Sequence, residues 1–104
     1  MPNKNRLKGD RWERRVKSIM EKDGFYVNRQ PGSKFPDLIC LKCTPRNDDL
    51  EKHDIRLIEC KVKRKYFSKK EREDILIMAE QLGATPILAY RDGRKPVMEK
   101  VVPK

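Results

Sequence analysis

Apolar residues near the start of the chain recur at the spacing of an α-helix. One face of this helix carries Trp12, Val16, Ile19 and Met20, which stand at i, i+4, i+7 and i+8. Asp10 lies where an N-cap would be, and Glu13 follows three residues later, as in a capping box. Gly24 is a typical C-terminal stop. The pattern therefore predicts a helix from about Arg11 to Lys22.

Further along, short apolar runs alternate with polar segments that contain glycine or proline. The runs predict strands at Phe25 to Arg29, Asp37 to Lys42, Ile55 to Lys63 and Thr85 to Tyr90, with a short return strand at Val97 to Val102. The polar segment from Thr44 to Asp54 contains a proline and predicts a hairpin loop. Asp92-Gly93 predicts a turn before the return strand.

A second helix is expected between the third and fourth strands. It opens with the capping-box pattern Ser68-Lys69-Lys70-Glu71, and Gly83 ends it. The resulting order is α-β-β-β-α-β, followed by the short return strand. This order predicts an α/β fold with a mixed central β-sheet flanked by helices. The length of 104 residues fits a single domain spanning residues 1–104.

Two acids and one lysine are expected to meet at one end of this sheet. Side chains alternate between the faces of a strand, so Glu59 and Lys61 project from the same face. Asp37 begins the preceding strand, and a hairpin would bring it beside the end of the strand that carries Glu59. Neighbouring carboxylates repel each other, and a shared cation relieves the repulsion. Mg²⁺ prefers oxygen ligands and is commonly held by one or two carboxylates plus phosphate.

These residues also have simpler interpretations, which the local pattern leaves open. Glu59 and Lys61 are also consistent with an ordinary ion pair on a wet sheet face. Asp37 is also consistent with a turn cap, and Glu13 with the capping-box partner of Asp10.

The charge of the chain favours a nucleic-acid partner. Lys and Arg total 26 against 16 Asp and Glu, which gives a net charge of +10. Seven basic residues near the proposed site are candidates for contacts with the DNA backbone: Arg11, Arg14, Arg29, Lys34, Lys63, Arg64 and Lys65. The simpler interpretation is a solvated basic surface.

Nothing in the sequence predicts a membrane protein or a secreted one. No run approaches the roughly 18 apolar residues that a membrane span needs. The segment Met1 to Lys8 is polar and basic, unlike a signal peptide. We therefore expect an intracellular protein acting on DNA without membrane contact, of cellular or viral origin.

The motifs, taken together, resemble those of a known nuclease family. Pro36-Asp37 followed by Glu59-Cys60-Lys61 is similar to the PD-(D/E)XK nuclease signature. Further segments resemble archaeal Holliday junction resolvases in their order: Lys8-Gly9, Glu13-Arg14, Gly32-Ser33-Lys34 and Leu82-Gly83-Ala84-Thr85-Pro86. The resemblance covers roughly Lys8 to Arg91, most of the chain.

This resemblance implies a restriction-endonuclease-like fold, a homodimer, and cutting of four-way DNA junctions with Mg²⁺ or Mn²⁺. It implies that Glu13, Asp37 and Glu59 bind the metal and that Lys61 is catalytic. It assigns Arg14, Arg29 and Ser33 to the active site or to DNA binding. The chain ends at Lys104, whereas these resolvases usually continue through C-terminal structure that contributes to the dimer.

Three other functions stay open. One is a related nuclease acting on other branched DNA or on duplex, and another is a basic DNA-binding module without activity. The third is a zinc-stabilised adaptor, because Cys40-Leu41-Lys42-Cys43 is a CxxC and both Cys60 and His53 are available. Cys60 lies on the strand face opposite Glu59, so we expect it to pack in the core.

Overall fold

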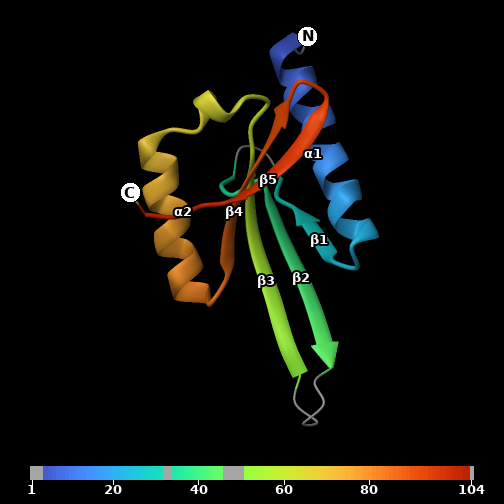
Figure 1. Ribbon diagram of the computed structural model, residues 1–104, viewed down its shortest axis with the longest axis vertical. Helices are drawn as coiled ribbons and strands as arrows, with labels where there is room; N and C mark the ends of the chain where they lie inside the picture. The colour runs from blue at the N-terminus through green and yellow to red at the C-terminus, as the bar shows by residue number, and fades with distance from the viewer. Residues whose placement is uncertain (1–3, 32–33, 46–50, 104) are drawn as a thin grey trace.

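The computed structural model describes residues 4–31, 34–45 and 51–103. It contains one five-stranded sheet in the order β1-β2-β3-β4-β5, with a helix on each face (Figure 1). The elements are α1 (Lys4–Lys22), β1 (Tyr26–Arg29), β2 (Leu38–Pro45), β3 (Glu51–Cys60), a 3-10 turn η1 (Arg64–Tyr66), α2 (Lys69–Leu82), β4 (Thr85–Asp92) and β5 (Lys95–Lys100). Strands β3 and β4 are parallel, and the other neighbouring pairs are antiparallel. The predicted fold, a mixed sheet flanked by helices, is therefore confirmed.

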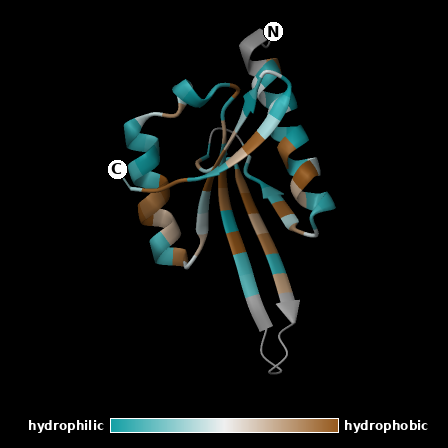
Figure 2. Ribbon diagram, viewed as in Figure 1, coloured by the Kyte–Doolittle hydropathy of each residue, from teal (hydrophilic) through white to brown (hydrophobic). Residues whose placement is uncertain are grey.

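The alternation of side chains along the strands builds a separate core on each face of the sheet. On one face, Trp12 and Val16 of α1 pack with buried strand residues such as Ile58. On the other face, Ile75 of α2 packs with Leu57 and other buried residues. Figure 2 shows hydrophobic and hydrophilic residues alternating along β3, whereas the first four residues of β2 are all apolar, as expected for a sheet covered by a helix on each face. The two cores thus hold α1 and α2 on opposite faces of the sheet.

Among the described residues, α1 begins at Lys4, so the predicted cap at Asp10 is wrong. Asp10 lies inside the helix, and Glu13 is therefore not the partner in a capping box. The Asp10 carboxylate instead pairs with Arg14 and with Arg29 of β1. Asp10, which the local pattern assigned to a cap, is thus used in tertiary ion pairs. The helix continues through Gly9 although glycine has a low helix propensity.

Strands β2 and β3 extend well into the segment that was expected to form a loop. Their register runs as far as Pro45 opposite Glu51, so the predicted loop from Thr44 to Asp54 is wrong at both ends. Residues 46–50, between the strands, lie outside the described part of the chain. The polarity of this segment is compatible with a strand pair because the ribbon projects beyond both helices, where its faces are not covered (Figure 1).

The ends of the remaining elements agree more closely with the sequence. The Ser68 side chain accepts a hydrogen bond from the Glu71 backbone at 3.1 Å, and the Glu71 side chain accepts one from Ser68 at 3.0 Å. Gly83 ends α2 in the left-handed region at φ +64°. Strand β5 begins two residues earlier than expected. No helix in the described ranges combines the length and the apolar character needed to span a bilayer.

Candidate active site

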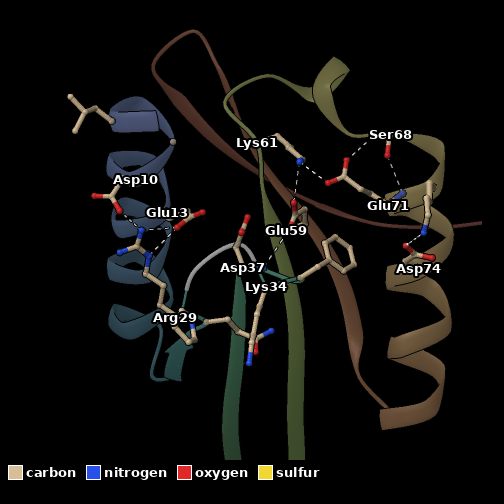
Figure 3. Close-up of a pocket in the computed structure, with 16 residues that line it drawn as sticks. Asp10, Glu13, Arg29, Lys34, Asp37, Glu59, Lys61, Ser68, Glu71 and Asp74 are labelled. Carbon is tan, nitrogen blue, oxygen red and sulfur yellow. Dashed lines mark hydrogen bonds and ion pairs between the residues drawn. The ribbon is translucent and has the colours of Figure 1, made fainter. Parts of the chain in front are cut away.

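An open pocket of about 1360 Å³ lies between the two helices, at the end of the sheet where β2 begins and β3 ends. Asp37 immediately precedes β2, and Glu59 is the penultimate residue of β3. Figure 3 shows both carboxylates between Glu13, which projects from α1, and Glu71, which projects from α2. Lys61 lines the same pocket. The predicted meeting of Asp37, Glu59 and Lys61 at one end of the sheet therefore agrees with the structure.

Backbone hydrogen bonds fix the two central carboxylates beside each other. The Asp37 backbone N–H donates to Glu59 Oε1 at 3.2 Å. The Cys60 backbone N–H donates to Asp37 Oδ2 at 2.9 Å. The hairpin register that pairs Leu38 with Ile58 produces this reciprocal arrangement. One oxygen of each carboxylate is thus held by the main chain, and the second is left for other partners.

Glu59 is an acid in an environment that opposes its charge. Its side chain is buried, with the whole residue 5% exposed. Burial and then the negative charge of Asp37 raise the pKa of Glu59 from 4.5 to about 8, although Lys61 acts in the opposite direction. A divalent cation beside these oxygens would remove the penalty that raises this pKa.

Lys61 bridges the floor of the pocket and the second helix. Its Nζ lies 3.1 Å from Glu59 Oε2 and 2.6 Å from Glu71 Oε2. Burial acts to lower the pKa of Lys61, but the hydrogen bond to Glu71 and the neighbouring carboxylates outweigh it and raise the pKa overall. The lysine is therefore held as a cation. Lys61 follows the end of β3, but its backbone N–H still donates to Ala89 in β4, at 2.9 Å.

Glu13 approaches the pocket from the α1 side, through an ion network. Arg29 Nε donates to Glu13 Oε2 at 2.9 Å, and the same guanidinium contacts Asp10. Burial and the charge of Asp37 raise the pKa of Glu13, and Arg29 acts against this shift. Arg29, a predicted DNA-contact residue, therefore lies in the pocket wall with its charge opposed to two carboxylates.

The oxygen ligands around the pocket suit a hard divalent cation, although no complete ligand set is preformed. In residues 4–31, 34–45 and 51–103, no three His, Cys, Asp or Glu side chains lie close enough to hold a metal ion. Asp37 and Glu59 form the close pair, and Glu13 lies near enough for Asp37 to affect its pKa. Two carboxylates plus water and phosphate are a common arrangement for Mg²⁺.

The predicted DNA-contact residues fall into two groups. Arg29 and Lys34 line the pocket. The others lie outside its lining: Arg11, Arg14, Lys63, Arg64 and Lys65. Two of these are paired with acids, Arg14 with Asp10 at 3.2 Å and Arg64 with Glu99 at 3.1 Å. Ser33, a predicted active-site residue, lies outside the described residues.

The cysteines do not gather into a zinc site in the described parts of the chain. Cys40 and Cys60 are buried in the core that packs against α1, as expected for Cys60. Cys43 is exposed. Burial raises the pKa of Cys40 to about 11, which disfavours the thiolate that a metal requires.

Among the pocket residues that the sequence did not reveal, Asp10 and Glu71 were overlooked because both matched capping patterns. The capping assignment was right for Glu71 but incomplete, since the same carboxylate also contacts Lys61. A second signal was available in the sequence. Glu71 opens the helix that follows the strand of Glu59 and Lys61, so its first turn was bound to lie near them.

Comparison with known proteins identifies the family of this chain. Residues 4–103 match a family described as archaeal Holliday junction resolvase. The chain belongs to this family. The predicted resemblance to these resolvases is therefore confirmed.

Two relatives of the resolvase family align with most of the chain. The crossover junction endodeoxyribonuclease Hjc of Methanocaldococcus jannaschii is 34% identical over 87 residues, which are 81% of this chain and 59% of the relative. The chain thus spans about three-fifths of the length of this curated relative. The solved structure of the Holliday junction resolvase Hjc from Archaeoglobus fulgidus matches with a TM-score of 0.67 and 25% identity, over 90% of this chain and 73% of that one.

Proposed function

We propose that this chain is a divalent-metal-dependent DNA endonuclease that cuts four-way junctions, with Mg²⁺ as its cofactor and Mn²⁺ as a substitute. The observation that carries the proposal is the pairing of Asp37 with the buried Glu59, with Lys61 beside them, at the floor of an open pocket. The names of the two relatives support the junction as the substrate.

Each residue of the pocket has a role that its surroundings support. Asp37 and Glu59 would hold the cation, with Glu13 completing the ligand set from α1. The chemistry supplied by a bound divalent cation is activation of water and stabilisation of charge on the phosphate. Lys61 would direct its ammonium at the phosphate oxygen on which negative charge develops. Arg29 would orient Glu13, which it contacts at 2.8 Å.

Basic residues around the pocket would hold the DNA backbone without reading its sequence. Lys34 lines the pocket and is exposed, so it would contact phosphate beside the cleaved bond. We assign Arg11, Arg14, Lys63, Arg64 and Lys65 to phosphates farther from the cut, and Ser33 to the active site. A net charge of +10 supports contacts of this kind.

We further propose that two copies of the chain act together. Each chain carries one Asp37–Glu59 pair, whereas separating a four-way junction into two duplexes needs cuts in two strands. A symmetric homodimer would present two such pairs to opposing strands. Sedimentation of the protein bound to one junction tests this, because a homodimer requires two chains per junction.

The test of the proposed function compares a labelled four-way junction with a duplex of matched sequence. Each DNA is incubated with the protein in Mg²⁺, in Mn²⁺ and in EDTA, beside the variant Lys61→Ala. The proposal predicts paired symmetric cuts in the junction alone, lost in EDTA and reduced by at least about 100-fold in the variant. Equal cutting of the duplex would exclude junction selectivity. Absence of cutting with either metal, despite tight binding, would exclude a nuclease.

A further inference from the structure

The Glu71 carboxylate makes two contacts, one with each of its oxygens. Its Oε1 accepts a hydrogen bond from the backbone N–H of Ser68, at 3.0 Å, and its Oε2 lies 2.6 Å from Lys61 Nζ. The first contact belongs to the capping box of α2, and the second reaches the floor of the candidate active site (Figure 3). The N-terminal turn of α2 is therefore joined directly to the lysine of the pocket.

The second partner of Lys61 is the residue proposed to bind the metal. Lys61 Nζ contacts Glu59 Oε2 at 3.1 Å, and Glu59 Oε1 already accepts from the Asp37 backbone. If Glu59 Oε2 binds a cation, the ammonium beside it is repelled by that cation and loses this acceptor. The Glu71 contact is the shorter of the two and involves no proposed metal ligand. It is the contact able to keep Lys61 in place when the site is loaded.

The Glu71 side chain is well placed to act as a fixed anchor. The capping box holds it at both ends, because the Glu71 backbone also donates to Ser68 Oγ at 3.1 Å. Its side chain is 26% exposed and that of Lys61 is 23% exposed, so the pair is partly shielded from water. A helix cap needs only an oxygen that accepts from Ser68, and it does not require a charge or a partner lysine.

We propose that Glu71 is a positioning residue, which holds the Lys61 ammonium in the pocket when Glu59 is occupied by metal. The proposal rests on the nuclease function proposed above. The first turn of α2 would then do more than support the sheet, because it sets the position of the Lys61 ammonium that meets the phosphate. The residue acts through Lys61 and does not itself touch the DNA.

The decisive variant is Glu71→Gln, which keeps an oxygen for the Ser68 backbone and removes the charge that binds Lys61. The matched control is Glu73→Gln, which makes the same change of charge in the same helix at an exposed position. Cleavage of a labelled junction is measured over a range of protein concentrations with Mg²⁺, and junction binding is measured with Ca²⁺. Glu71→Gln should lower the maximal cleavage rate by about 10- to 100-fold. The dissociation constant should change by less than about twofold, and Glu73→Gln should match the parent.

Two further variants separate positioning from helix capping. Glu71→Asp keeps the charge on a shorter side chain and should recover part of the lost rate. Ser68→Ala removes the hydroxyl of the capping box but keeps the carboxylate, so it should cost thermal stability more than cleavage rate. If Ser68→Ala lowers the rate as much as Glu71→Gln, the role of Glu71 is only structural and the proposal is overturned.

A measurement without DNA separates this proposal from the nuclease assignment. In ¹⁵N-labelled protein, a lysine ammonium held in an ion pair gives a resolved signal at low temperature, and Lys61→Arg identifies the signal of Lys61. Mg²⁺ is added so that Glu59 no longer serves Lys61 as an acceptor, and the signal should then persist in Glu73→Gln and disappear in Glu71→Gln. If the parent cuts no DNA, the nuclease assignment fails and this signal alone decides the Glu71 contact. If the parent cuts and Glu71→Gln cuts equally fast, the positioning proposal fails while the nuclease remains.

Discussion

Replacing Glu59 by glutamine should change how the stability of the metal-free protein depends on pH. Glutamine resembles the protonated carboxyl in size and polarity but does not ionise. Burial and the charge of Asp37 raise the pKa of Glu59 from 4.5 to about 8. A carboxyl with a raised pKa binds its proton more tightly in the folded chain than in the unfolded chain. Its contribution to stability is complete below pH 4.5 and is lost as the pH rises through about 8.

The size of the effect follows from these two pKa values. From pH 5 upward the unfolded chain has already released most of the Glu59 proton, whereas the folded chain still retains about half of it at pH 8. At about 1.4 kcal/mol per pH unit, the parent should lose about 3 kcal/mol relative to Glu59→Gln across this interval. A constant difference in packing between the acid and the amide cancels, because only the change with pH is compared.

Urea unfolding in EDTA at several pH values measures this difference directly. Titratable groups that do not interact with Glu59 cancel in the comparison, and Glu80→Gln, an exposed change in α2, serves as the control that should follow the parent. Adding Mg²⁺ at pH 8 should stabilise the parent and leave Glu59→Gln nearly unchanged, because binding to the folded state alone shifts unfolding. Parallel stability curves for the parent and Glu59→Gln from pH 5 to pH 8 would refute the electrostatic account of the pocket.

Two further predictions concern the residues around the pocket. Arg29→Ala removes a partner from each of Asp10 and Glu13, both partly buried, and should lower the free energy of unfolding by about 1 to 2 kcal/mol after allowing for solvent screening. Urea unfolding at pH 7 checks this, and an unchanged midpoint would show that the ion network is not stabilising. Lys34→Ala should weaken junction binding and reduce the slope of log Kd against log salt by about 0.9, as expected for one lost phosphate contact. An unchanged slope would place Lys34 away from the DNA backbone.

The central triad was predictable because it depends on two short-range rules. Alternation along β3, which continues one residue beyond its end, puts Glu59 and Lys61 on a common face, and hairpin pairing brings the start of β2 to the end of β3. Neither rule depends on details of packing. The same two rules predict Cys60 in the opposite core, where it lies.

The residues around the central Asp37, Glu59 and Lys61 were harder to predict from the sequence. Asp10 and Glu13 match the pattern of a helix start, but α1 runs from Lys4 to Lys22 and both residues instead contact Arg29, sixteen or more residues away. The ribbon of β2 and β3 was mistaken for a loop because strand pairing satisfies the backbone even where the side chains are polar. The position of Glu13 at the pocket was implied by family resemblance, since its local pattern favoured a cap.

The most direct test of the central claim is the single-turnover rate of junction cleavage by Asp37→Asn in Mg²⁺. The isosteric amide keeps the side-chain oxygen available to the Cys60 backbone but removes a charge from the proposed metal site. Asp92→Asn, at an exposed position at the end of β4, is the matched control. We expect a loss of at least about 100-fold for Asp37→Asn with junction binding retained, and a parental rate for Asp92→Asn. Cleavage by Asp37→Asn at the parental rate would contradict the assignment of this pocket as the active site.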